Sequence, residues 1–345
     1  MRVLVFVFVW LGMCINGVDA QLKSLSIDDT NDSNLRPKQP GEYGWIPKKD
    51  AYFYFEKDKK AWQIVDLSSK KEHLLFVDSM IKDLKRGGLD TFSSTPSLIW
   101  ISMDTVQFKV NNKIYAYNIN KRALQEVNQW EPEAENMEFS KKNDLAYTKS
   151  GNIYLKLRDS KTAQVLTDGD GYQVVFGEAV HRNEFGINKG LFWNESGDKL
   201  AFYRMDQSQV ADYPLIDYKP IPATVKNIKY PMAGQTSHFV TIGIYDLNMG
   251  SIVYLNTGLP MDQYLTNIAW DPSGEYIYVA IINRDQNHVE MNKYSSADGS
   301  FKKTIFEEKN EKYVQPMHPL TFLQNNRTKF IWMSQRSGYD HLYLY

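Results

Sequence analysis

Cysteine is almost absent from this 345-residue sequence, whose single cysteine, Cys14, lies close to the N-terminus. An excess of charge of one sign is also missing, because 40 Lys and Arg residues face 41 Asp and Glu residues. That balance argues against a nucleic acid as the partner, since phosphate binding favours a basic protein. By contrast, hydrophobic residues make up 43% of the chain, and 22 Tyr, 17 Phe and 8 Trp are present. This composition excludes wholesale disorder and favours packed β-sheets.

No apolar run is long enough to predict a membrane span, and residues 3–15 are typical of a signal peptide instead. Arg2 precedes this run, and Val18 and Ala20 provide small residues before Gln21, so we expect cleavage of residues 1–20. A lipoprotein signal ending at Cys14 is the alternative. Cleavage after Ala20 would remove Cys14. The remaining chain is therefore expected to have no disulfide, no thiol nucleophile and no membrane span. The protein is therefore expected to be exported, to a periplasm or the extracellular space.

Short β-type runs separated by polar turns follow a polar leader at residues 21–45. Only Val77–Arg86 has helical spacing, with Gly87 as a stop signal. An aromatic residue followed by a polar turn and an apolar strand recurs along the chain, although the interval that contains residues 207–232 is longer and indicates an insertion. The aromatic residues of this repeat are Phe139, Trp193, Trp270 and Phe322.

The turn that follows Trp270 shows why this repeat predicts β-hairpins. Pro272 presets φ, and Gly274 supplies the positive φ of a tight turn. Four strands per repeat predict an all-β fold, a β-propeller of four-stranded blades over residues 46–345, with a β-sandwich as the alternative. We count about five to six blades. The last one runs into the end of the sequence, so the propeller is expected to be incomplete.

Several segments resemble the dipeptidyl peptidase IV and prolyl tripeptidyl aminopeptidase family of exported serine peptidases. They are His181-Arg-Asn-Glu-Phe-Gly-Ile-Asn-Lys-Gly190, Leu200-Ala-Phe-Tyr-Arg-Met-Asp-Gln207, Tyr230-Pro-Met-Ala-Gly234, Phe330-Ile-Trp-Met-Ser-Gln-Arg-Ser-Gly338 and His341-Leu-Tyr-Leu-Tyr345. The resemblance implies an N-terminal eight-bladed propeller that caps a C-terminal α/β-hydrolase domain with a Ser-Asp-His triad. Here no serine has the G-x-S-x-G setting of such a nucleophile, so we expect the hydrolase domain and every catalytic residue to be absent.

The resemblance also implies a substrate-binding role for Glu184. In the family, an acidic side chain of the propeller pairs with the free N-terminus of the peptide, and Glu184 occupies that position. Dipeptidyl members carry adjacent glutamates, whereas Asn183 precedes Glu184 here, which leaves dipeptide and tripeptide release both open. The family's carbonyl-binding arginine has no counterpart in residues 107–113, and Lys109 is given no role.

The sequence therefore predicts the propeller portion of an exported peptidase that releases X-Pro dipeptides or tripeptides, itself inactive. Its partners would be peptides with proline near the N-terminus, and a second copy of the chain at full length. A non-catalytic secreted binding module is the alternative. The six histidines show no metal-ligand spacing, so no metal or cofactor is expected. Asp206 is expected to form a structural ion pair with Arg204.

Overall fold

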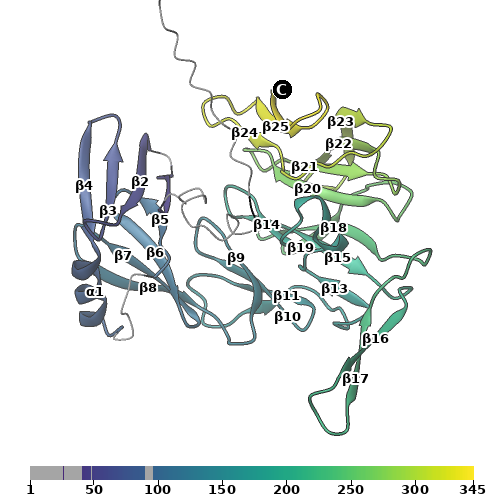
Figure 1. Cartoon of the computed structure of the whole chain (residues 1–345), viewed down its shortest axis with the longest axis horizontal. Coiled ribbons are helices and arrows are strands. Elements are labelled where there is room, and N and C mark those ends of the chain that lie inside the picture. Colours follow the sequence, from purple (N-terminus) through teal and green to yellow (C-terminus); the bar gives the residue numbers. More distant parts are fainter. Residues whose placement is uncertain (1–25, 27–40, 48, 90–95) are drawn as a thin grey trace, which may run out of the picture. The chain divides into compact units, whose positions relative to one another are not determined.

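The computed structural model describes residues 26, 41–47, 49–89 and 96–345, and it divides the chain into two compact units, Met1–Phe76 and Val77–Tyr345 (Figure 1). The expected signal peptide lies outside the described residues, as does most of the expected polar leader. Among the described residues, no helix is both long enough and apolar enough to span a membrane.

The first unit contains one four-stranded antiparallel sheet in the order β1-β2-β3-β4. Side chains alternate between the two faces of a strand, and in the first half of β2 those of Ala51 and Phe53 are buried. Trp62 and Ile64 of β3 are buried as well. The sheet begins within the segment expected to be a leader. Its strands are β1 (Tyr43–Trp45), β2 (Ala51–Glu56), β3 (Ala61–Asp66) and β4 (Lys71–Phe76).

The second unit opens with the one segment expected to be helical, and α1 covers Val77–Arg86 as predicted. Its buried Asp83 accepts two hydrogen bonds from the guanidinium of Arg122, at 2.8 and 2.9 Å, and one from the hydroxyl of Tyr117 at 2.6 Å. Burial acts to raise the pKa of Asp83, but these hydrogen bonds outweigh it and leave the pKa below its usual value. The ionised carboxylate thereby fastens the helix to the sheet that follows.

Four further sheets of the second unit are simple antiparallel meanders. Together with the sheet of the first unit and the split sheet described next, they make six propeller blades among the described residues, which confirms the predicted fold class. The blade that ends at β26 has three strands. The strands of these four sheets are β5 (Ile99–Ser102), β6 (Thr105–Val110), β7 (Lys113–Asn118) and β8 (Ala123–Gln129); β9 (Glu135–Phe139), β10 (Leu145–Lys149), β11 (Asn152–Lys156) and β12 (Gln164–Val165); β20 (Tyr264–Trp270), β21 (Tyr276–Ile282), β22 (His288–Ser295) and β23 (Phe301–Lys309); and β24 (Thr321–Phe322), β25 (Phe330–Ser334) and β26 (His341–Leu344).

The remaining blade has a first strand that is split in two. Both β13 and β14 pair with the same edge of β15, β13 through Phe176 opposite Arg204 and β14 through Leu191 opposite Phe202. Tyr203 bridges the gap, because its carbonyl accepts from Gly177 N–H and its N–H donates to the Gly190 carbonyl. No motif in the sequence predicted β13. The strands are β13 (Val174–Phe176), β14 (Leu191–Trp193), β15 (Lys199–Asp206), β18 (Phe239–Asp246) and β19 (Ser251–Tyr254).

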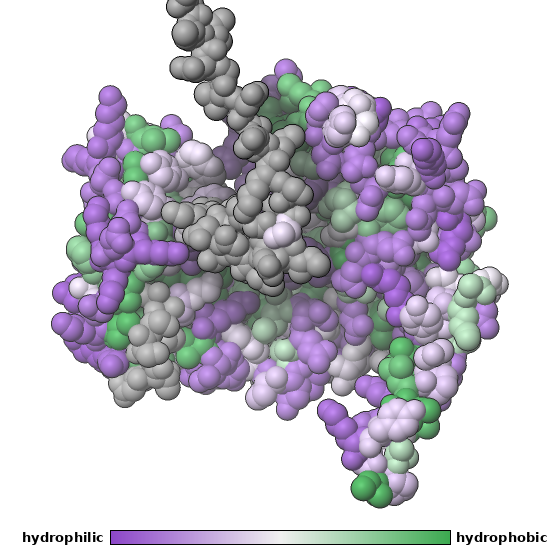
Figure 2. All heavy atoms as spheres, viewed as in Figure 1, coloured by the Kyte–Doolittle hydropathy of each residue, from purple (hydrophilic) through white to green (hydrophobic). Residues whose placement is uncertain are grey.

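The expected insertion is a two-stranded arm between β15 and β18. It consists of β16 (Asp212–Asp217) and β17 (Thr224–Lys229), and it extends away from the blade (Figure 1). Several apolar side chains of the arm are exposed, and Figure 2 shows them as hydrophobic patches along it. At the base of the arm, the predicted ion pair between Arg204 and Asp206 is present at 3.2 Å.

Neighbouring blades of the second unit are joined through the aromatic residues of the repeat. The indole N–H of Trp193 donates to the carbonyl of Glu138 in the preceding blade at 3.0 Å, and that of Trp270 donates to the carbonyl of Phe192 at 2.9 Å. Phe322 packs edge-on against Tyr278 of the blade before it. Both tryptophans are half-buried.

A matched pair of glycine substitutions tests the contact between blades. Gly274 has φ +75°, and a Cβ there would lie 2.7 Å from Nδ2 of Asn194 in the preceding blade. Gly250 has a similar φ of +65° but no atom within 4 Å. We expect Gly250→Ala to lower the free energy of unfolding by about 1 kcal/mol and Gly274→Ala by about 2–3 kcal/mol. Urea denaturation measures both, and equal losses would contradict a tight contact.

Candidate functional site

The candidate site is an excursion that leaves the split strand at Gly177 and returns at Gly190. A Cβ at Gly190 would lie 2.2 Å from the carbonyl oxygen of Glu178, so only glycine lets the two ends of the excursion approach so closely. Between them lies a 3₁₀ segment, η2 (His181–Gly186), which carries Glu184. The split strand therefore presents Glu184 from a blade edge.

The backbone of η2 is strained. His181, Arg182, Asn183 and Phe185 have φ values between 51° and 62°, in the left-handed region, while Glu184 between them is extended at φ −63° and ψ 160°. Each such non-glycine residue costs roughly 1–3 kcal/mol, and this kind of strain is concentrated at functional sites. The surrounding contacts must therefore hold the segment in place.

Two buried side chains of η2 supply part of that support. Phe185 packs edge-on against Tyr264 of β20, with ring centroids 5.1 Å apart. The His181 backbone N–H donates to Nε2 of His238, and Nε2 of His181 accepts from Leu265 N–H. Gly186 lies so close to the chain before β24 that a Cβ would be 2.1 Å from the Met317 carbonyl oxygen. The segment is thus fixed by neighbouring blades on more than one side.

The exposed side of η2 is held by the arm. The Arg182 guanidinium donates to the carbonyl of Lys229 at 2.9 Å and lies 4.2 Å from the ring centroid of Tyr230. A pocket of about 170 Å³ is lined by His181, Asn183, Lys229 and His238, among others. The base of the arm and η2 therefore form the walls of one small depression.

Glu184 itself is exposed, and its carboxylate accepts one hydrogen bond from Nε2 of Gln286 at 3.0 Å. Gln286 lies in the turn between β21 and β22 and also donates to the Tyr264 hydroxyl at 3.1 Å. Arg284 of the same turn donates to that hydroxyl at 2.7 Å. Among the residues that the structure describes, no lysine or arginine forms an ion pair with Glu184. The carboxylate is oriented but not neutralised, which suits a cationic ligand.

The chain resembles known proteins over most of its length. A family model for the dipeptidyl peptidase IV N-terminal region matches residues 97–345. The chain belongs to this family. The matched residues contain the candidate site and every described blade of the second unit.

Solved structures agree with this membership. The chain is 36% identical to a Bacteroides ovatus protein described as a dipeptidyl aminopeptidase IV, with a TM-score of 0.73, over 86% of this chain and 41% of that one. Porphyromonas gingivalis dipeptidyl peptidase 4 shares the fold at 21% identity and a TM-score of 0.66, over 90% and 45%. A dipeptidyl-aminopeptidase B of Phaeosphaeria nodorum is 26% identical over 59% of this chain and 26% of its own length. The chain thus spans less than half of each relative.

Two clusters outside the site have residue types that can carry chemistry. Ser337 Oγ lies 2.8 Å from Nδ1 of His341, but in the described part of the chain no carboxylate contacts the other ring nitrogen, as a triad requires. His288, Glu290 and Glu307 bring ligand atoms within 4.8 Å of one another, a proximity that the sequence spacing did not indicate. Lys309 also contacts Glu307, at 3.1 Å, so we assign this cluster to surface ion pairing.

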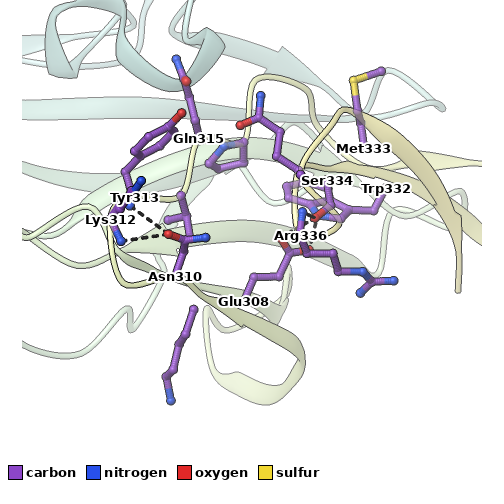
Figure 3. Close-up of a pocket in the computed structure, with 14 residues that line it drawn as sticks. Glu308, Asn310, Lys312, Tyr313, Gln315, Trp332, Met333, Ser334 and Arg336 are labelled. Carbon is purple, nitrogen blue, oxygen red and sulfur yellow. Dashed lines mark hydrogen bonds between the residues drawn. The ribbon is translucent and has the colours of Figure 1, made fainter.

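A larger pocket of about 220 Å³ lies between β23 and β25 and was not predicted (Figure 3). Asn310 and Tyr313 lie on one side, and Ser334 and Arg336 lie on the other. Glu308 of β23 also lines the pocket, and its carboxylate accepts hydrogen bonds from the Trp332 indole and the Ser334 hydroxyl of β25. These hydrogen bonds join β23 of one blade to β25 of the next, so we assign the pocket to a structural junction between two blades.

The structure differs from the sequence analysis in which residues it gathers around Glu184. Gln286, Tyr264 and Arg284 were not predicted, because the turn that carries two of them has no motif. The sequence spacing of the histidines gave no reason to pair His181 with His238, whereas their rings lie 5.1 Å apart in the interior. Lys109, which was given no role, lies 5.3 Å from the ring centroid of Phe139.

Proposed function

We propose that this chain is the propeller portion of an exported serine peptidase that releases X-Pro dipeptides or tripeptides. The observation that carries the proposal is the oriented, unneutralised carboxylate of Glu184 on a segment fixed by buried contacts. The protonated N-terminus of a peptide is the natural partner for such a group, because a charge-assisted hydrogen bond is stronger than a neutral one. Membership of the family supports this reading, as do relatives named for dipeptidyl aminopeptidase activity.

The propeller would thus admit the substrate and bind its N-terminus. Hydrolysis requires a nucleophile, and no serine of this sequence has the G-x-S-x-G setting. The single carboxylate, with Asn183 in place of a second one, favours a site that recognises one ammonium without selecting dipeptides strictly. Export to a periplasm or the extracellular space is supported by residues 1–20 alone.

The proposed inactivity of the 345-residue chain can be measured directly. Purified protein should not hydrolyse fluorogenic Gly-Pro or Ala-Ala-Pro substrates above the rate of buffer. Ser337→Ala serves as the control for the serine that contacts His341. Turnover that disappears in Ser337→Ala would refute the inactive-propeller proposal.

Recognition of a free N-terminus should be detectable by titration calorimetry with a short Ala-Pro peptide and its N-acetylated form. Removing the ammonium, or changing Glu184→Gln, should each weaken binding by about 10-fold, because each removes the same charge-assisted contact. Glu275→Gln is the matched control, since this exposed glutamate lies on a turn of the next blade. If Glu184→Gln binds both peptides as the unaltered chain does, Glu184 does not recognise the N-terminus.

We further propose that the arm pairs with the arm of a second copy. Its exposed apolar side chains include Ile221 at 99% and Val225 at 63% exposure. The strand β16 carries Asp212 and Asp217, whereas β17 carries Lys226 and Lys229. An isologous dimer would place the acidic strand of one copy against the basic strand of the other.

Self-association should therefore depend on the arm. Light scattering after size exclusion should show a dimer for the unaltered chain and a monomer for Ile221→Asp combined with Val225→Asp, because the buried apolar area would be lost. Leu259→Asp is the control, because Leu259 is 82% exposed outside the arm. A dimer that survives the double substitution would rule out this interface.

A further inference from the structure

The two buried histidines beneath Glu184 form a chain of hydrogen bonds that crosses between blades. The first link runs from the backbone N–H of His181 to Nε2 of His238, at 3.3 Å, on the residue that precedes β18. The second runs from the N–H of Leu265, on β20, to Nε2 of His181 at 3.2 Å. His181 is 5% exposed and His238 is 9% exposed, so no bulk water replaces either link.

Both links require a neutral ring. In each, Nε2 is the acceptor, so the ring proton must be on Nδ1, and a second proton on Nε2 would convert the acceptor into a donor. The N–H of a protonated ring would then point at the backbone N–H that had donated a hydrogen bond to the neutral ring. The contact that holds His181 in its left-handed conformation would become repulsive.

The surroundings also oppose protonation. Arg182 on the same segment and Arg284 on the β21–β22 turn face the two rings, Tyr264 of β20 packs against His181, and Lys229 lines the same pocket as His238. Burial first, then the charge of His238 and Arg284, holds the pKa of His181 well below its usual value. Burial, then Arg182 and Arg284, lowers the pKa of His238 to about 4.

We propose that His181 and His238 are positioning residues for Glu184, a latch that holds η2 in its recognition geometry only while both rings are neutral. Acidification opens the latch and releases Glu184 from its position. The link to peptide recognition rests on the proposed function, whereas the latch itself is a property of the fold.

The direction of the pH effect follows from the two states. An exposed histidine in the opened segment binds a proton near pH 6.5, whereas His238 in the closed segment binds one only near pH 4. The open state therefore gains protons first, so the latch is strongest above about pH 6.5 and weakens as the pH falls toward about 4.

Hydrogen exchange of the full 345-residue chain tests the latch. Between about pH 6.5 and about pH 4.5, the protection factors of the His181 and Leu265 amides should fall by up to about a hundredfold per pH unit, because two histidines gain a proton when the segment opens. His238→Gln supplies an amide oxygen that accepts the same N–H at every pH and leaves His181 as the one buried histidine that gains a proton on opening. Its protection should therefore fall less steeply, by no more than about tenfold per pH unit. His238→Leu has no acceptor and should lack protection at His181 even at neutral pH.

His73→Gln is the control, because His73 is exposed on β4 of the other unit and should behave as the unaltered chain does. Ring ¹⁵N spectra give a second measurement that does not depend on a variant folding: both buried histidines should carry their proton on Nδ1 at neutral pH. An Nε2-protonated tautomer at either ring would overturn the proposal. An acid loss of protection that persists unchanged in His238→Gln would overturn it as well.

Peptide titrations separate this inference from the proposed function. If exchange follows His238 as described but Glu184→Gln leaves peptide binding unchanged, the latch stands and the recognition role of Glu184 fails. If Glu184→Gln abolishes binding while exchange at His181 is independent of pH and of His238, recognition stands and the latch is refuted.

Discussion

The second unit depends on one requirement, which is that each sheet must cover an apolar face of the next. In the blade that carries the candidate site, Ile242 and Ile244 of β18 pack with Ile277 and Val279 of β21 in a shared core. The tryptophans of the repeat add a directional contact to this non-directional packing, since each indole N–H reaches a carbonyl of the preceding blade. Packing alone would allow neighbouring sheets to slide, whereas these hydrogen bonds fix their register. The positions of η2 and the β21–β22 turn follow from that register.

At the candidate site, the strained backbone of η2 is held in place by packing and hydrogen bonds from other segments. Four non-glycine residues of η2 have left-handed conformations, which an isolated peptide would not keep. The ring of Phe185 and Nε2 of His181 both contact β20, and the His181 N–H donates to His238 just before β18. The backbone that carries the exposed Glu184 is consequently held in one conformation, and its carboxylate accepts a hydrogen bond from Gln286. A ligand that meets it does not have to order it first, which reduces the entropy lost on binding.

Local patterns allowed much of the fold to be predicted, but not the surroundings of Glu184. The helix at Val77–Arg86 and the turn glycine Gly274 are encoded by neighbouring residues, so spacing and turn chemistry were enough to identify them. The partners of η2 are distant in sequence, with Gln286 102 residues beyond Glu184 and His238 57 residues beyond His181. No pattern in one sequence reports which turn of the next blade will lie beside a given carboxylate. The split strand was missed for a related reason, because β13 has only three residues and pairs across the excursion.

The pairing of Asp206 with Phe239 has a consequence for how this protein can change over time. It closes the β15–β18 ladder at the root of the arm, so the departing and returning chains leave the blade side by side. Residues can be gained or lost beyond that root without shifting the ladder, because the sheet is already in register there. Mutation can thus remodel the arm's reach while the blade stays unaltered, and descendants of one ancestor can differ in the arm yet retain the same η2 segment.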